Sequence, residues 1–348
     1  MNIRNLWNFH GFWISLIMGI GVLATLLVLT VNRDAIRHLL AIGPLSIVLV
    51  LALRGCSVAC WGLRLAVLCR GLGYPLAVRR AIRLVLLGLL SNITAPGQAG
   101  GETFRIYELG RDRMATGTAA AVVVTERLLD VVVIGGIIFA SALMVQPVRV
   151  VFTATFLGSL AALVILVGGL FVIVYYGVWH PETTKRSVKY IFGRFMDRCA
   201  RSGRLKNICP SDRDRGSLMD AVDRDIGLFE EGIGKLSKDG RGFVAAALGM
   251  TALLWTFDFA VASLLLIALG QPPYVPESFL FQAIFQVIAQ IPPMPEAVAV
   301  TIGAASLYAL IIQTYLVGVF VLLWRLFEHY LNAPLEFIAG LFSVGEGD

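Results

Sequence analysis

The chain has 348 residues, of which 57% are hydrophobic and 15% are charged, and its formal net charge at pH 7 is +6. Soluble globular domains carry about 25% charged residues, so this composition excludes a water-exposed exterior and predicts an all-α polytopic membrane protein. The excess of Lys and Arg predicts loops that face anionic lipid and the cytoplasm, with no nucleic-acid partner.

The first apolar segment, 12–31, contains twenty residues without a charge. At 1.5 Å per residue, a helix of this length crosses a hydrocarbon core of about 30 Å. A cleaved signal peptide would have a shorter apolar region followed by a small-residue cleavage pattern, so we expect a retained transmembrane helix. A polar turn at 32–38 then precedes a second apolar stretch, 40–68, which Arg54 and Arg64 interrupt.

Three more apolar segments follow, at 81–95, 118–143 and 150–177. The first of them is only fifteen residues long and ends in a turn rich in Pro and Gly, 96–102. Fifteen residues are too few to span the hydrocarbon core. A turn of this kind is tolerated inside a membrane only where it borders protein or a water-filled cavity. Segment 81–95 is therefore expected to be re-entrant, entering and leaving on the same side.

One large polar segment, 178–242, holds 14 of the 29 Lys and Arg residues. The positive-inside rule places this segment in the cytoplasm. Within it, apolar residues recur at three- and four-residue steps from Leu218 to Leu236, the pattern of an amphipathic helix. We expect this helix to pack on a neighbouring helix or on the membrane surface.

The C-terminal part returns to the membrane. A long apolar helix at 243–269 contains Asp258 and leads into a loop, 270–277, that has no Lys or Arg. A short apolar segment, 278–291, breaks at the Pro-rich stretch 292–296. The remaining residues, 297–342, are mostly apolar and are expected to include a long final helix that contains Arg325, while the sequence leaves the number of helices in this range open.

The charge distribution predicts opposite orientations for the two halves of the chain. With the 178–242 loop in the cytoplasm, Arg79 and Arg80 lie on the cytoplasmic side only if segment 81–95 is re-entrant, and the N-terminus is then cytoplasmic as well. Segment 278–291 would enter from the opposite side. Paired short segments of this kind mark the midplane binding site of transporters.

The predicted architecture is a single membrane domain, 1–348, with about six full transmembrane helices and two re-entrant helical hairpins. The first inverted repeat covers 40–143 and the second covers 243–342, with the cytoplasmic helical loop 178–242 between them. We expect this domain to lie in the cytoplasmic (inner) membrane. The sequence leaves homo-oligomer formation open.

Charged side chains inside apolar segments cost about 2.5–3.5 kcal/mol each on insertion scales, so they are expected to face a cavity or a partner. The predicted substrate-binding residues are Arg54, Gly100, Gly101, Glu102, Arg105, Glu126, Arg127, Asp130, Gln286, Gln290, Glu296, Arg325 and Glu328. Candidates for proton coupling are Glu102, Asp130, Asp258 and Glu296. The alternative for any one of them is a salt bridge that fixes helix packing, as in the i, i+3 pairs Glu102–Arg105 and Arg325–Glu328.

These residue types suit an anionic headgroup. A helix that begins at depth after Gly100-Gly101 directs free N–H groups and a positive dipole end into the membrane interior. The planar guanidinium of arginine offers a fork of donors that matches phosphate. Glutamines at 282, 286 and 290 recur every four residues and would form a polar stripe on the second short helix, either for a headgroup or for interhelical hydrogen bonds.

A family resemblance supports this interpretation. The stretch 92–102 reads NITAPGQAGGE, followed by Arg105 and by the run ERLLD at 126–130. This combination resembles the signature of the flippase-like transmembrane domain, the membrane half of bacterial lysylphosphatidylglycerol synthases, which also occurs alone in bacterial and archaeal proteins. The stretch PPMPE at 292–296, with Arg325, is similar to a second family motif, although prolines and Met294 stand where glycines are usual.

The resemblance implies that the chain moves a phospholipid or a polyprenyl-linked lipid between leaflets. It does not imply synthase activity, because no soluble aminoacyl-transfer domain follows Asp348. The first alternative is a membrane enzyme acting on lipid-linked substrates, but no nucleophile, P-loop or metal-ligand spacing supports it, so we expect no enzyme activity, metal or cofactor. The second alternative is a scaffold that recruits a lipid-modifying enzyme through 178–242.

Overall fold

The computed structural model describes the chain at residues 10–94, 99–111, 114–145, 212–289 and 296–330, and at the single positions 169, 190 and 194. All regular elements in these ranges are helices. Three of them are long and apolar enough to cross a membrane: α4 (Pro44–Gly71), α7 (Thr116–Met144) and α11 (Arg241–Ala268). The prediction of an all-helical, multi-pass membrane protein is therefore confirmed.

The other helices are shorter or more polar. They are α2 (His10–Thr30), α3 (Arg33–Leu40), α5 (Val78–Thr94), α6 (Ala99–Arg111), α10 (Asp212–Lys238), α12 (Val275–Ile288), α13 (Glu296–Tyr308), α14 (Thr314–Arg325) and a π-helix (Leu326–Tyr330). The predicted apolar segment 150–177 lies outside the described residues, apart from position 169.

The polar turn expected at 32–38 is itself the beginning of a helix. The side chain of Asn32 accepts a hydrogen bond of 2.9 Å from the backbone N–H of Ala35 and so caps α3. The next helix, α4, has Pro44 at its first position, where the missing N–H costs no hydrogen bond. The sequence therefore breaks the expected 40–68 segment into the end of α3 and a separate long helix.

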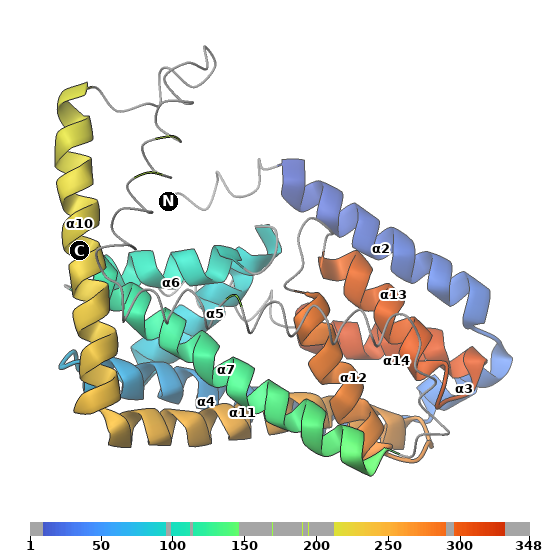
Figure 1. Ribbon diagram of the computed structural model, residues 1–348. Coiled ribbons are helices and arrows are strands. Elements are labelled where there is room, and N and C mark those ends of the chain that lie inside the picture. Colours follow the sequence, from blue (N-terminus) through green and yellow to red (C-terminus); the bar gives the residue numbers. More distant parts are fainter. Residues whose placement is uncertain are drawn as a thin grey trace.

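The number of helices in 297–342, which the sequence left open, is answered for the described residues 297–330. The chain forms two helices there, α13 and α14, with a break at 309–313. Gly318 on α14 faces α2 so closely that a Cβ atom would lie 2.1 Å from the hydroxyl oxygen of Thr30. Figure 1 shows α2 lying along α13 and α14, so a short α14 that packs on α2 replaces one continuous span.

Two hydrophobic clusters hold these helices together. The smaller joins α4, α5 and α7 through residues such as Leu65, Leu84 and Val122. The larger surrounds α11 to α14 and contains Phe259 and Trp324. The helices α4 and α11 lie side by side, and their labelled parts are at the bottom of the view in Figure 1. Large apolar side chains also cover outward-facing positions, including Val28, Leu45, Phe139 and Leu143, as expected for surfaces in contact with acyl chains.

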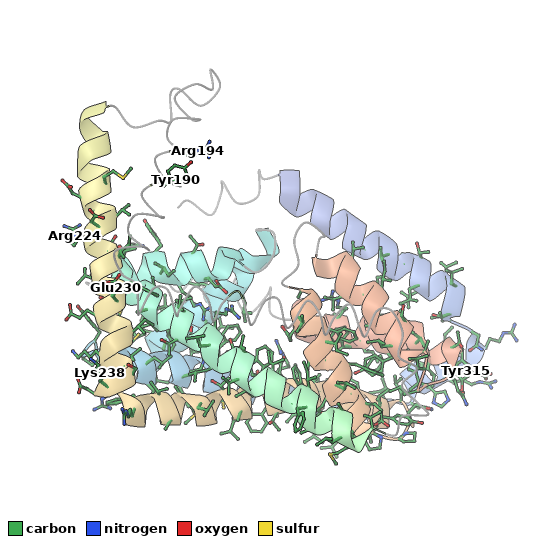
Figure 2. All side chains as sticks on the ribbon, in the orientation of Figure 1. Tyr190, Arg194, Arg224, Glu230, Lys238 and Tyr315 are labelled. Atoms are coloured by element: carbon green, nitrogen blue, oxygen red, sulfur yellow. The ribbon has the colours of Figure 1, made fainter. Side chains whose placement is uncertain are left out.

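The amphipathic helix predicted within 178–242 is present as α10 and packs on α7, as one of the two expected arrangements. Ile233 and Leu236 on its apolar face are buried. The amine of Lys235 donates a 3.3 Å hydrogen bond to the carbonyl of Leu72, at the end of α4. Figure 2 shows Arg224, Glu230 and Lys238 spread along α10, which extends past the rest of the bundle.

The close approach of α10 to α7 depends on a glycine. A Cβ atom on Gly117 would lie 1.9 Å from the carbonyl oxygen of Asp225. Gly117→Ala is expected to force the two backbones apart at a cost of about 1–3 kcal/mol, the range for overpacking. Faster amide hydrogen exchange in α10 would report this loss.

The matched control is Gly135→Ala, also on α7, where an added Cβ meets nothing within 4 Å. Because alanine favours helix over glycine, this variant should retain or increase protection. Equal exchange rates in α10 for the two variants would show that the contact at Gly117 does not hold α10 in place.

Candidate functional site

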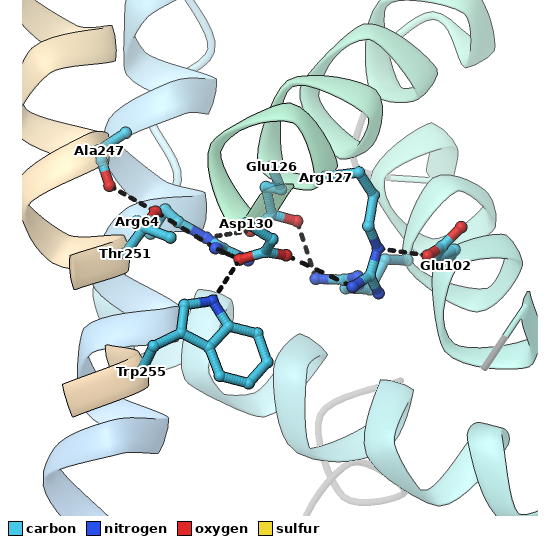
Figure 3. Close-up of polar contacts among 9 residues, drawn as sticks. Arg64, Glu102, Glu126, Arg127, Asp130, Ala247, Thr251 and Trp255 are labelled. Carbon is cyan, nitrogen blue, oxygen red and sulfur yellow. Dashed lines mark hydrogen bonds and ion pairs between the residues drawn. The ribbon is translucent and has the colours of Figure 1, made fainter. Parts of the chain in front are cut away.

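A buried cluster of opposite charges lies where α4, α6, α7 and α11 meet (Figure 3). We call it the arginine–carboxylate network, and it consists of six side chains: Arg64, Glu102, Arg105, Glu126, Arg127 and Asp130. The helical spacing explains part of this arrangement, because Glu126 and Asp130 are four residues apart on α7 and project from the same face. The third carboxylate comes from the first turn of α6.

Arg64 lies at the centre of the network and is 1% exposed. Its Nε atom donates to the carboxylate of Glu126 at 3.1 Å, and its Nη1 atom donates to Asp130 and, at 3.3 Å, to the hydroxyl of Thr251 on α11. Arg105 donates to the other oxygen of Glu126 at 2.8 Å. A single carboxylate therefore bridges the arginines of α4 and α6.

Two tryptophan side chains contact the buried charges of the network. The indole N–H of Trp255 on α11 donates to Asp130 at 2.9 Å. The guanidinium groups of Arg64 and Arg105 lie over the ring of Trp61 at 5.7 and 5.3 Å from its centroid. Both distances are within the range of cation–π attraction. Three helices thus hold each inner charge in a fixed direction.

The outer side of the network is more accessible. Arg127 pairs with Glu102 and also donates to Asp130 at 3.4 Å. The side chains of Arg127 and Glu102 are 18% and 30% exposed, whereas those of Arg64 and Glu126 are 1% exposed. The exposure of the side chains therefore increases from the buried Arg64–Glu126 pair to the Arg127–Glu102 pair at the outer edge of the network.

The network is electrically balanced, with three arginines and three carboxylates. Balance matters because an uncompensated charge inside a membrane protein is strongly unfavourable. Each guanidinium faces at least one carboxylate, and this pairing offsets part of the free-energy cost of burying the charges. The arrangement can bind an anion only by exchange with, or close to, one of its own carboxylates.

The structure brings five of the predicted site residues into this network, and it does not form the i, i+3 salt bridge between Glu102 and Arg105 that was the alternative for these residues. Glu102 pairs with Arg127, and Arg105 pairs with Glu126. Gly100 and Gly101 lie in the first turn of α6, which begins at Ala99 rather than after them. The central residue, Arg64, was absent from the predicted site, although a charge inside an apolar stretch was a signal that could have identified it.

Arg54 and Asp258 form a separate ion pair between α4 and α11. Ser57 donates to the same oxygen of Asp258 at 3.2 Å, and Nη2 of Arg54 donates to the carbonyl of Glu328 in the π-helix at 3.2 Å. Ten residues of α4 separate Arg54 from Arg64, or about 15 Å along the helix. The predicted single site around these arginines is therefore divided into two centres.

The remaining predicted residues lie in the C-terminal half. Arg325 donates to Thr301 at 3.2 Å and lies over the ring of Trp324. Gln282, which belongs to the predicted polar stripe, donates to the hydroxyl of Tyr308 at 3.3 Å. Gln286 is partly buried. Gln290, the side chain of Glu296 and the Pro-rich stretch 292–295 lie outside the described part of the chain.

Another ion-paired carboxylate, that of Glu108, lies on α6 outside the network, and it serves below as a control for Glu102. Glu108 pairs with Arg80 at 3.2 Å and with Arg111 at 3.0 Å. Its carboxylate resembles that of Glu102 in being ion-paired and on the same helix.

In the part of the chain that the structure describes, no group of three or more His, Cys, Asp or Glu side chains is placed to hold a metal.

Comparisons with known proteins agree with a membrane protein of this kind. A UPF0104 membrane protein of Archaeoglobus fulgidus is 25% identical over 273 residues, which cover 78% of each chain. A UPF0104 membrane protein of Methanocaldococcus jannaschii is 27% identical over 293 residues, covering 80% of this chain and 78% of the relative. No solved structure matches significantly. The family model for the lysylphosphatidylglycerol synthase transmembrane region matches residues 12–335, so the chain belongs to that family.

Proposed function

We propose that this protein moves a lipid with an anionic headgroup between the leaflets of the cytoplasmic membrane. The observation that carries the proposal is the arginine–carboxylate network, which is charge-balanced, buried among membrane helices and accessible at one edge. A purely structural salt bridge needs two charges, whereas this network concentrates six. Arginine is the side chain best suited to bind phosphate through paired N–H donors.

The helix lengths support a topology with two re-entrant hairpins. α5 and α6 contain 17 and 13 residues, and α12 and α13 contain 14 and 13. At 1.5 Å per residue these lengths give about 20–26 Å, shorter than a hydrocarbon core of about 30 Å. We propose that each pair enters and leaves the membrane on one side, within an inverted repeat and about six full transmembrane helices.

The proposed orientation follows from charge. Arg79 and Arg80 near the start of α5 and the basic segment 178–242 would lie in the cytoplasm together with the N-terminus. The first hairpin would then carry Glu102 and Arg105 into the membrane from the cytoplasmic side. We propose that the headgroup binds there while the acyl chains stay in lipid, and that the protein transports its lipid without altering it chemically.

The family name fits this proposal but does not define the lipid. The family is described as the transmembrane region of a synthase whose named product, lysylphosphatidylglycerol, is a phospholipid, and this supports a lipid-related role. We place the headgroup at the network and regard the Arg54–Asp258 pair as a second polar centre deeper along α4. Glu102 and Asp130 are the proposed proton-coupling residues.

The proposal is tested by leaflet exchange of a fluorescent phospholipid in proteoliposomes. The wild-type chain should accelerate exchange and show a dependence on pH. Glu102→Gln and Asp130→Asn should each slow exchange by about tenfold or more, because each removes a charge-assisted contact worth ~1.5–3 kcal/mol. Both variants should also reduce the pH dependence.

Glu108→Gln is the matched control, and it should leave exchange and its pH dependence unchanged. Unchanged pH dependence in both network variants would exclude proton coupling through these residues. If the wild-type chain exchanged lipid no faster than empty vesicles, the transport proposal would fail. A chemical change of a radiolabelled lipid in detergent, where there are no leaflets, would instead favour an enzyme.

A further inference from the structure

At the accessible edge of the network, Arg127 contacts two carboxylates that differ in solvent-accessible exposure. Arg127 is 18% exposed, and it contacts a deeply placed carboxylate, Asp130, and a more accessible one, Glu102. The Asp130 side chain is 5% exposed and the Glu102 side chain 30%. One carboxylate partner of Arg127 is therefore buried and held by further contacts, and the other is partly exposed.

We propose that Glu102 occupies the place of a substrate phosphate. The monoanionic phosphate of a lipid headgroup displaces the Glu102 carboxylate from Arg127, and the carboxylate returns to Arg127 when the lipid leaves. This inference rests on the proposed function, because it assigns the network to a headgroup. It adds the identity of the displaced group and the charge of the ligand.

Charge balance determines the class of ligand. The network contains three positive and three negative groups, so exchange of one carboxylate for one monoanion keeps its total charge at zero. A dianion would leave an excess negative charge in a low-dielectric environment, which is strongly unfavourable. The structure thus favours a phosphodiester with a single negative charge.

Glu102 is the carboxylate with the fewest constraints. Glu126 accepts from both Arg64 and Arg105, and it is 1% exposed. Asp130 accepts from Arg64, Trp255 and Arg127. Removal of either would take a carboxylate partner from two arginines, one of which is the buried Arg64. Displacement of Glu102 affects Arg127, which keeps its contact with Asp130.

The position of Glu102 in the chain also suits an anion. Glu102 lies in the first turn of α6, whose thirteen residues give the helix a positive N-terminal end. A phosphate that replaces the carboxylate would meet both the guanidinium of Arg127 and this end of α6. Two independent features therefore converge on the site from which Glu102 departs.

The test measures binding of dioleoylphosphatidylglycerol to the full chain in detergent by native mass spectrometry. The headgroup of this lipid has one phosphodiester charge, and dioleoylglycerol, which lacks the phosphate, is the neutral probe. Glu102→Gln should bind the charged lipid about two- to fivefold more tightly than the wild type, the range for loss of a competing, partly exposed ion pair. Binding of dioleoylglycerol should not change.

Three further variants make the result specific. Glu108→Gln removes an ion-paired carboxylate from the same helix outside the network and should leave affinity unchanged. Arg127→Gln should weaken binding of the charged lipid by about tenfold or more. In the Glu102→Gln/Arg127→Gln double variant, the gain from Glu102→Gln should disappear, because the receiving guanidinium is absent.

Inorganic phosphate distinguishes a lipid-attached phosphate from a free one. If Glu102→Gln binds phosphatidylglycerol more tightly but not inorganic phosphate, the result supports displacement of Glu102 by a lipid-attached phosphate. If it binds both more tightly, the result supports displacement of Glu102 by either anion. Tighter binding of neither, or an equal gain in Glu108→Gln, overturns the proposal. If affinity rises as expected but the wild-type chain exchanges lipid no faster than empty vesicles, the displacement stands and the transport function fails.

Discussion

Replacement of Arg64 by leucine is expected to destabilise the folded protein by about 3–5 kcal/mol, the cost of removing one partner of a buried ion pair. Arg64 is 1% exposed and contacts Glu126, Asp130 and Thr251. Without it, two carboxylates lose a positive neighbour in a part of the protein that excludes water. Thermal unfolding of the purified chain in detergent measures the loss.

Two comparisons make the Arg64 result interpretable. Arg37→Leu removes an arginine whose side chain is 80% exposed and pairs with Asp34 near the start of α3, and it should have little effect because exposed ion pairs contribute little. Arg64→Lys keeps the charge but cannot reach two carboxylates with a planar fork. It should therefore retain the fold better than Arg64→Leu and still reduce leaflet exchange.

If Arg64→Leu and Arg37→Leu unfolded at the same temperature, the network would contribute no stability. The charges would then be present for binding alone. If instead Arg64→Lys retained full leaflet exchange, the paired geometry at Glu126 and Asp130 would be unnecessary, and a positive charge at this position would be sufficient.

The second large effect is expected at the Arg54–Asp258 pair, which joins α4 to α11 in the apolar part of the molecule. Arg54→Leu and Asp258→Leu should each destabilise the protein by about 3 kcal/mol or more, because each leaves one charge without its partner. The double leucine variant should recover most of this loss, because an apolar pair of similar volume needs no compensation.

A double-mutant cycle on unfolding measures the coupling. Ser57→Ala, which removes a neutral donor to the same carboxylate, is the control and should cost about 1 kcal/mol. Additive losses in the double leucine variant would mean that the two charges do not interact in the folded protein. Recovered stability with lost leaflet exchange would assign this pair to function as well as to packing.

Much of the fold was predictable because membrane insertion imposes strong local rules. A long, mainly apolar segment must be helical in lipid, since its backbone N–H and C=O groups have no other partners. This rule identified the segments that became α4, α7 and α11. Periodic apolar residues in 178–242 likewise predicted α10. The boundaries at α3 and between α13 and α14 depended on a cap at Asn32 and on packing against α2, which hydropathy does not report.

Part of the site was also predictable. Charges inside apolar segments cost free energy, and this cost identified five residues as members of a binding site or of ion pairs: Glu102, Arg105, Glu126, Arg127 and Asp130. The same reasoning grouped Arg54 with them and overlooked Arg64. Position along the chain could not separate these arginines, because both interrupt the same apolar stretch ten residues apart.

The sequence by itself determined that this is a helical membrane protein and which of its charges lie inside the apolar segments, because both properties follow from the local cost of placing polar groups in lipid. Only the tertiary structure decided which charges are partners. A long charged side chain pairs with a group on the helix that packs against its own. Arg105 and Glu102 therefore pair with residues of α7 rather than with each other. Arg64 is the centre of the network because α4 lies against both α7 and α11.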